Sequence, residues 1–318
     1  MPRHAHYVPH GVIPAVILSF TDDLAIDEKS FRKHLQDIAA VKGLSAITVN
    51  AHSTEVASCS FDEQRRVLAI AQDEIGGRLP IVNGIWADGS LEAARIARMA
   101  EEGGASALLV FPPAPFTLGQ SPAMAIEHFR RIADATSLPL IVFQYPLATG
   151  QGYPRDTLLK MCEEVPTIRA IKDWAGNVAQ HEMHVRELQS RKPPVNVLST
   201  HSAWLLSSLV LGCNGLLSGS GSVIADLQSA LFHAVKANDL AEARRINDRI
   251  YPLTRVFYAD PWADMHNRMK EALVLLDRLP RAIVRPPLVK ISRAEIDRIR
   301  AALVEAGLLS QKAARDAA

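Results

Sequence analysis

The chain has 318 residues, of which 48% are hydrophobic and 22% are charged. This composition is typical of a globular protein with a large core and excludes a disordered chain. The 35 basic residues nearly balance the 34 acidic ones, so the formal net charge of +1 provides no overall field that attracts nucleic acid or an anionic membrane. We expect neither as a partner.

The three cysteines, Cys59, Cys162 and Cys213, lie far apart and are odd in number, which fits neither a disulfide framework nor a zinc cluster. The first residues, MPRHAHYVPHG, lack the basic segment, apolar core and cleavage site of a secretory signal. No apolar run approaches the roughly 18 residues of a membrane span. We therefore expect a cytoplasmic protein.

Short apolar segments rich in β-branched residues recur along the chain, and segments with helical periodicity, such as residues 90–102 and 123–135, lie between them. This alternation favours a parallel sheet that closes into a (β/α)8 TIM barrel of the α/β class. No dinucleotide-binding glycine fingerprint supports a doubly wound sheet instead. The predicted strands are, in chain order, Val12–Leu18, Ala46–Val49, Leu79–Val82, Ala107–Phe111, Leu138–Tyr145, Ile168–Lys172, Val195–Ser199 and Gly215–Ser218.

The alternation of strands and helices stops after Ser222, and no linker or low-complexity tract follows. We predict one domain, in which residues 1–222 form the barrel and residues 223–318 form a C-terminal helical extension. Helical periodicity in this extension covers residues 224–237, 240–257, 262–279 and 293–307.

Lys172 ends the sixth predicted strand. Catalytic groups of (β/α)8 barrels lie where the strands end and the following loops begin. Strand periodicity places Ile168, Ala170 and Lys172 on one face, and Asp173 on the other. An inward-facing lysine loses water, which lowers the pKa of its amine and leaves a nucleophile for a ketone. The alternative is a lysine paired with a carboxylate at the barrel rim.

Six segments support a more specific interpretation: GVIPAVILSF at 11–20, AHSTE at 51–55, VFQYP at 142–146, AIKDWAGN at 170–177, LST at 198–200 and GLLSG at 215–219. In their order and spacing, the chain resembles the dihydrodipicolinate synthase and N-acetylneuraminate lyase family over essentially its whole length. The resemblance places Lys172 on the family's Schiff-base lysine. It implies a barrel, a homotetramer or dimer, and pyruvate or another 2-oxo acid held covalently.

The chain departs from the family pattern in four places. Residues 51–55 read AHSTE where the family usually has GTTGE, and Phe143 stands where the family has its catalytic tyrosine. A phenyl ring cannot transfer a proton. Residues 111–114 read FPPA in place of a tyrosine-bearing loop, and Ala148 stands where several synthases have an arginine. We therefore expect that the activity is not dihydrodipicolinate synthesis itself.

The acid and base must then come from other residues. His52 follows the second strand, and an imidazole titrates near neutral pH. Tyr145 lies two residues beyond Phe143 on the same strand face and reaches the barrel mouth if the loop turns inward. We expect catalytic roles for His52 and Tyr145, the alternatives being substrate packing and a hydrogen bond at the rim.

The remaining candidates are expected to bind substrate. Ser53 and Thr54 offer hydroxyl and backbone NH donors to a carboxylate. His201 follows the seventh strand and either faces the distal part of the substrate or is structural. Glycines and serines after the eighth strand suggest a phosphate site, but the resemblance makes them a wall of the 2-oxo acid pocket. The predicted substrate-binding residues are Ser53, Thr54, Phe143, His201, Ser218 and Gly219.

We expect no metal and no cofactor. His181 and His184 have helical spacing, but they do not form the HExxH motif of metalloproteases, and we interpret them as a surface face of a helix.

Three functions remain open. The first is a class I lyase, an aldolase that uses Lys172, a 2-oxo acid and an apolar or aromatic aldehyde. The second is a dehydratase of a 2-keto-3-deoxy acid, which requires the same lysine. The third is a non-catalytic protein that binds a 2-oxo acid.

Overall fold

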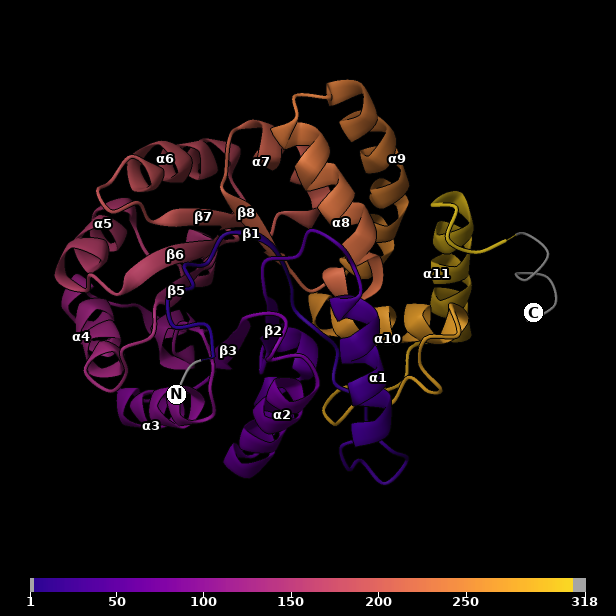
Figure 1. The fold of residues 1–318 in the computed structure, drawn as a ribbon, viewed down its shortest axis with the longest axis horizontal. Coiled ribbons are helices and arrows are strands. Elements are labelled where there is room, and N and C mark those ends of the chain that lie inside the picture. The colour runs from indigo at the N-terminus through magenta and orange to yellow at the C-terminus, as the bar shows by residue number, and fades with distance from the viewer. Residues whose placement is uncertain (1–2, 311–318) are drawn as a thin grey trace.

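The computed structural model describes residues 3–310 and contains one eight-stranded parallel sheet, with the strand order β1-β8-β7-β6-β5-β4-β3-β2. Bridges from Val12 to Leu44 and from Ala15 to Thr48 join the two ends of this order, so the sheet closes. The predicted (β/α)8 TIM barrel is confirmed (Figure 1). The strands are β1 (Gly11–Pro14), β2 (Ile47–Val49), β3 (Ile81–Ile85), β4 (Ala107–Val110), β5 (Leu140–Gln144), β6 (Ile168–Asp173), β7 (Asn196–Ser199) and β8 (Gly215–Ser218).

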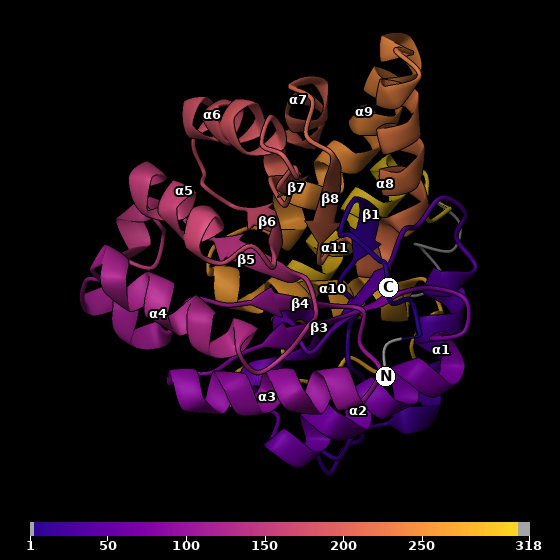
Figure 2. The ribbon, with the colours of Figure 1, turned by 60° about the vertical axis from the view of Figure 1, so that its left-hand side comes forward.

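Helices follow the strands and form the outer layer of the barrel (Figure 2). Side-chain caps define several of their starts: Ser60 and Glu63 form a capping box before α2, and Asn177 accepts a hydrogen bond from Gln180 N at the start of α6. The barrel helices are α1 (Glu28–Ala39), α2 (Phe61–Glu74), α3 (Ser90–Glu102), α4 (Pro122–Ala133), α5 (Arg155–Glu164), α6 (Val178–Gln189), α7 (Leu205–Val210) and α8 (Gly221–Lys236).

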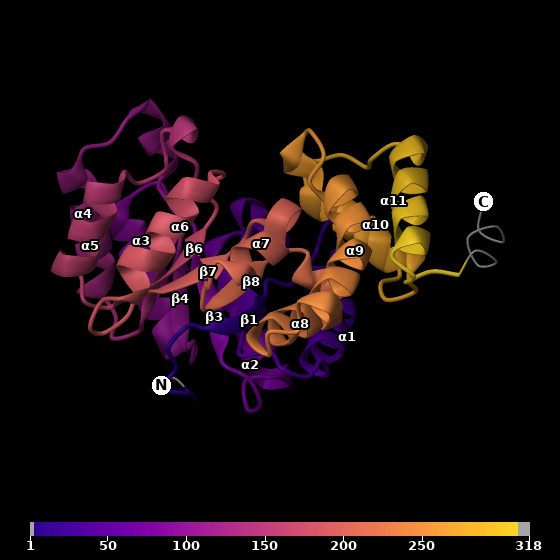
Figure 3. The same ribbon diagram turned by 90° about the horizontal axis from the view of Figure 1, so that it is seen from above.

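Three further helices, α9 (Leu240–Phe257), α10 (Met265–Leu275) and α11 (Arg293–Glu305), pack together at one side of the barrel (Figure 3). The C-terminal helices predicted from the sequence are therefore present. The division at residue 222 stays a prediction, and residues 1–2 and 311–318 of its two parts lie outside the described residues. None of the helices within residues 3–310 has the length and apolarity needed to span a membrane.

The side chains inside the barrel change from small and aliphatic to aromatic along the barrel axis. Small and aliphatic side chains such as Val82, Ala170 and Leu217 fill part of it, whereas Phe111, Phe143 and Tyr145 lie at the carboxyl ends of β4 and β5. A separate, larger cluster fills the space between the strands and the helices. The aromatic end of the interior is the end at which barrel enzymes place their active sites.

One irregularity separates β5 from β6. Leu140 pairs with Ile168, but Ile141 pairs with Ala170, so Arg169 is an extra residue in β6. The predicted strict alternation is wrong at this point: Ile168 packs in the outer cluster, whereas Ala170 packs inside the barrel. Lys172 keeps the inward orientation of Ala170, because the irregularity precedes both residues.

Candidate active site

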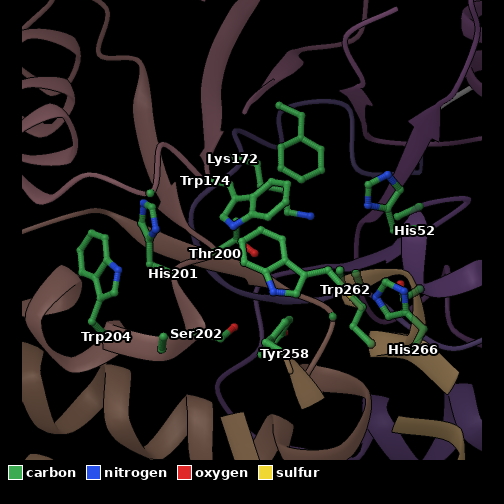
Figure 4. A pocket seen from close by; sticks show the side chains of 18 residues that line it. His52, Lys172, Trp174, Thr200, His201, Ser202, Trp204, Tyr258, Trp262 and His266 are labelled. Atoms are coloured by element: carbon green, nitrogen blue, oxygen red, sulfur yellow. The ribbon is translucent and has the colours of Figure 1, made fainter. Parts of the chain in front are cut away.

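A cavity of about 230 Å³ lies at the carboxyl ends of the strands. Its wall is largely aromatic, and it contains one lysine and three histidines (Figure 4). The lining residues are Ala15, Ala51, His52, Ser53, Phe143, Lys172, Trp174, Gly176, Thr200, His201, Ser202, Ala203, Trp204, Gly219, Tyr258, Trp262, Met265 and His266.

Lys172 projects from β6 into this cavity and is only 6% exposed. Its Nζ lies 3.9 Å from the centroid of the Phe143 ring, the residue with which it pairs in register. Among residues 3–310, no carboxylate forms an ion pair with Lys172. Burial lowers the pKa of Lys172 from 10.5 to about 7. The alternative of a lysine paired at the rim is therefore not observed.

His52 also lines the cavity, at the start of the short helix η1 (His52–Thr54) that follows β2. Its ring packs against Trp86, Phe111 and Phe143, with centroid separations of 4.7 to 5.8 Å. Burial and then the nearby charge of Lys172 lower the pKa of His52 to about 3. The imidazole is therefore neutral near pH 7.

Tyr145 is connected to the cavity by a hydrogen bond to His52. Its hydroxyl lies 3.1 Å from His52 Nε2, and Tyr145 itself is not among the lining residues. Burial raises the pKa of the Tyr145 phenol, so the phenol keeps its proton. A protonated phenol and a neutral imidazole can share a hydrogen bond along which a proton can pass.

Of the six predicted substrate-binding residues, four line the cavity, including Phe143 and His201, and two do not. Ser53 and Gly219 line the cavity, and no residue of the described chain forms a hydrogen bond with the buried Ser53 hydroxyl. The Thr54 hydroxyl instead donates to the Ala51 carbonyl oxygen at 2.8 Å, and the Ser218 hydroxyl lies 2.9 Å from that of Ser220. Local hydrogen bonds therefore already engage the hydroxyls of Thr54 and Ser218, and a role for these two residues in substrate binding stays a prediction.

Glu55 connects this region to the C-terminal helices. Its carboxylate forms a buried ion pair with Lys270 of α10 and accepts a hydrogen bond from Arg285 N at 3.0 Å. Lys270 Nζ also donates to the Ile283 carbonyl oxygen at 2.7 Å. These contacts hold the segment that carries His52 and Ser53 against the C-terminal part of the chain.

The C-terminal helices also supply cavity residues that are not among the predicted site residues. Trp262 lies 5.1 Å from the Trp174 ring, centroid to centroid, and His266 of α10 is buried in the wall (Figure 4). A Cβ on Gly219 would lie 2.8 Å from His266 Nε2, so a larger residue at this position would displace the His266 ring. In the sequence, Trp174 is visible only as an aromatic residue directly after the sixth strand. Trp262 and His266 are visible only as isolated residues in the C-terminal extension.

Asp173 faces away from the cavity and is completely buried. Its Oδ2 accepts hydrogen bonds from His181 Nδ1 and His184 Nδ1, both at 2.8 Å, and its Oδ1 accepts one from Ala175 N at 2.8 Å. His201 Nε2 lies 3.6 Å from Asp173 Oδ1. Burial alone would raise the pKa of Asp173, but the hydrogen bonds from the histidines outweigh it and hold this pKa well below 3.8.

The prediction that His181 and His184 form a surface face is wrong. Both are buried, because α6 turns them toward the outer face of β6, where the Asp173 carboxylate requires partners. His201 lines the cavity and also lies close to Asp173. Its ring stacks on Trp204 at 4.0 Å between centroids. One carboxylate and three imidazoles thus converge behind the cavity wall.

Comparisons with known proteins show the family and the fold of this chain. Residues 8–306 match the sequence model described as the dihydrodipicolinate synthetase family. A 4-hydroxy-tetrahydrodipicolinate synthase from Chloroherpeton thalassium is 28% identical over 95% of this chain and 97% of its own length. A synthase of the same name from Dechloromonas aromatica is 30% identical over 94% of this chain and 99% of its own length.

Solved structures show the same fold. A prophage protein of the dihydrodipicolinic acid synthase family from E. coli, solved in complex with pyruvate, superimposes with a TM-score of 0.87 at 23% identity. The match covers 94% of this chain and 99% of that protein. A monomeric dihydrodipicolinate synthase variant also gives a TM-score of 0.87, at 21% identity over 95% of this chain and 98% of its own.

Proposed function

The chain belongs to the dihydrodipicolinate synthetase family of lyases, and from this premise we propose that it is a class I aldolase that forms a Schiff base between Lys172 and pyruvate or another 2-oxo acid. The observation that carries the proposal is the buried amine of Lys172, which faces the cavity without a carboxylate partner among the described residues. A buried lysine without a counter-ion is a nucleophile rather than a structural cation.

The reaction begins when the neutral Nζ attacks C2 of the 2-oxo acid. The carbonyl oxygen leaves as water, and an iminium joins Lys172 to C2. Removal of a proton from C3 sends its electron pair toward the iminium and gives an enamine. C3 then forms a bond to the aldehyde carbon, the aldehyde oxygen takes a proton, and water releases the product and restores the amine.

His52 and Tyr145 are the groups we propose for these proton transfers. A neutral imidazole accepts the C3 proton, and the hydrogen bond of 3.1 Å to the Tyr145 hydroxyl orients its ring. Phe143 cannot serve in this role, but its ring covers one side of the lysine and keeps water away.

The 2-oxo acid carboxylate requires donors close to Lys172. The Ser53 hydroxyl lines the cavity and is buried without a partner in the described chain, so a bound carboxylate would satisfy it. We propose Ser53 as the carboxylate-binding residue, with Gly219 giving the substrate room beside His266.

The second substrate is, in this proposal, an apolar or aromatic aldehyde. The cavity wall contains Phe143, Trp174, Trp204, Tyr258 and Trp262, whereas none of its lining residues is an arginine, aspartate or glutamate. A charged amino aldehyde would find no ionic partner there, and burying an unpaired charge is costly. This contrast supports an activity other than that of the synthases named above.

The proposal also includes an oligomeric state and a cellular location. A homotetramer or dimer is implied by the family resemblance and stays a prediction. The cytoplasm remains the proposed location, because Cys59, Cys162 and Cys213 are all unpaired and buried, as suits a reducing compartment.

The test is a turnover assay with pyruvate and either benzaldehyde or an amino aldehyde that bears a carboxylate. We predict equal consumption of pyruvate and benzaldehyde, one carbon–carbon-bonded product by mass spectrometry, and no product with Lys172→Ala. A higher kcat/KM for the amino aldehyde would overturn the proposed specificity. Water loss from a 2-keto-3-deoxy acid, without turnover of any aldehyde, would replace the aldolase with the dehydratase.

A further inference from the structure

We propose that Asp173, His181 and His201 form a binding site for one divalent transition-metal ion of the Zn²⁺ type, on the outer face of β6 behind the cavity. One ligand atom from each residue lies within 4.8 Å of the others, and all three residues are buried. Lys172 projects to the opposite face of the strand, and of the three proposed ligands only His201 also lines the cavity.

The separation of His201 from Asp173 is the first observation. His201 Nε2 lies 3.6 Å from Asp173 Oδ1, which is beyond the roughly 2.7–3.2 Å of a hydrogen bond between nitrogen and oxygen. Two ligand atoms that each lie about 2.0–2.1 Å from a tetrahedral zinc ion are roughly 3.3–3.4 Å apart. The observed distance therefore matches two atoms that share an ion better than a donor and its acceptor.

The second observation is the unpartnered nitrogen itself. His201 is 3% exposed, and its Nε2 has no hydrogen-bond partner within residues 3–310. A buried polar atom without a partner costs free energy comparable to a lost hydrogen bond. Coordination to a metal ion would satisfy the lone pair of this nitrogen, and the nitrogen points toward the Asp173 carboxylate.

Contacts around the three residues hold their rings in position. His181 Nε2 lies 2.7 Å from the Ser208 hydroxyl, and the His201 ring stacks on Trp204 with an angle of 22° between the planes. Metal-binding imidazoles commonly use their second nitrogen as His181 does here, to fix the tautomer and the ring orientation. His184 Nδ1 donates to Asp173 Oδ2 at 2.8 Å and would remain as an outer partner of the carboxylate.

The chemical types of the three ligands indicate which ions the site would bind. Two imidazoles and one carboxylate suit Zn²⁺ and its neighbours in the first transition series, and they are too few and too nitrogen-rich for Ca²⁺ or Mg²⁺. A bound ion would take the place of the proton that His181 Nδ1 now shares with Asp173 Oδ2. It would tie together β6, α6 and the segment after β7, and so would fix the loops that carry Trp174 and Trp204.

The experiment uses the full chain, treated with a chelator, dialysed and checked for folding by circular dichroism. We expect one equivalent of Zn²⁺ per chain by titration calorimetry, and a visible absorption band typical of tetrahedral Co²⁺ when Co²⁺ is bound. Asp173→Asn, His181→Asn and His201→Ala should each lower the Zn²⁺ affinity at least about 100-fold, whereas loss of an outer partner in His184→Gln should lower it about 10-fold.

Two controls make the result decisive. His6→Ala/His10→Ala removes exposed histidines near the N-terminus and should leave the affinity unchanged. His201→Ala is the variant of choice if Asp173→Asn does not fold, because His201 lies in a loop segment. Folded protein that binds less than one equivalent of Zn²⁺, or His201→Ala protein that binds as tightly as the parent, would overturn the proposal and leave a purely hydrogen-bonded cluster.

Discussion

The amine of Lys172 and the ring of Phe143 are stacked neighbours: Nζ lies 3.9 Å from the ring centroid, and the two residues pair in register between β5 and β6. The position at which the family usually has a proton-transferring phenol thus holds an apolar surface against the nucleophile. The phenol of Tyr145, which directly follows β5, shares a hydrogen bond with His52 instead. In the proposed mechanism, the proton transfers at Lys172 would therefore depend on the imidazole of His52.

The first prediction concerns His52 and Tyr145. His52→Ala should lower kcat about 10²–10⁴-fold, the usual contribution of a general acid or base, without preventing borohydride trapping of the iminium. Tyr145→Phe should lower kcat less, since Tyr145 acts through His52. The double variant should resemble His52→Ala alone. Unchanged kinetics in His52→Ala would remove this residue from the mechanism.

The second prediction concerns Trp262, which meets Trp174 across the cavity at 5.1 Å between centroids. Trp262→Ala should raise KM for an aromatic aldehyde roughly 3- to 10-fold, because an aromatic contact is worth about 0.5–1.5 kcal/mol. The yield of the trapped pyruvate adduct should not change. Tyr251→Ala, on the exposed side of α9, is the matched control. Equal KM values in all three proteins would argue against an aromatic second substrate.

The third prediction concerns the buried ion pair between Glu55 and Lys270. Glu55→Gln should lower the free energy of unfolding by about 3–5 kcal/mol, because it leaves a buried ammonium group without its counter-ion. Glu55→Gln/Lys270→Met should recover part of this loss, since neither charge remains. Urea denaturation of the three proteins measures the effect. A double variant that is less stable than Glu55→Gln would contradict the explanation.

The fourth prediction concerns acid sensitivity and His128. This residue is 2% exposed, and burial lowers its pKa from 6.5 to about 4. The unfolded chain therefore binds a proton between these pH values, whereas the folded chain does not. The stability is full above pH 6.5 and falls as the pH approaches 4, by roughly 3 kcal/mol for this residue alone.

His128→Gln tests this assignment, because glutamine is neutral throughout and can still bond to the Ser90 hydroxyl, which lies 2.9 Å from His128 Nδ1. Urea denaturation between pH 7 and pH 4.5 should give a shallower loss of stability in the variant than in the parent protein. Parallel curves for the two proteins would show that His128 is not responsible.

The sequence predicted the barrel and the inward orientation of Lys172, because both follow from the pattern of residues along the chain. A lysine at the end of an apolar strand points inward or outward according to the strand alternation, and the irregularity at Arg169 precedes Lys172 and so does not disturb it. Ile168, on the other side of the irregularity, was assigned to the wrong face. An extra residue in one strand leaves no sign in hydrophobic periodicity.

The sequence could not predict groups that meet only in three dimensions. Strand alternation placed Asp173 opposite Lys172, but its partners come from α6 and from the segment after β7. Trp262 and His266 enter the cavity from an extension whose packing on the barrel has no local signature. The histidine spacing in α6 showed a shared helix face, and only the tertiary structure shows that this face is buried.

The most direct test of the aldolase account is intact-mass spectrometry after incubation with pyruvate and borohydride, with Lys172→Ala as the control. The parent protein should gain the mass of one reduced pyruvyl group, peptide mapping should place this group on Lys172, and the variant should gain nothing. Other 2-oxo acids should be tried if pyruvate leaves the mass unchanged. No adduct with any of them, or an adduct that persists in Lys172→Ala, would contradict the Schiff-base mechanism.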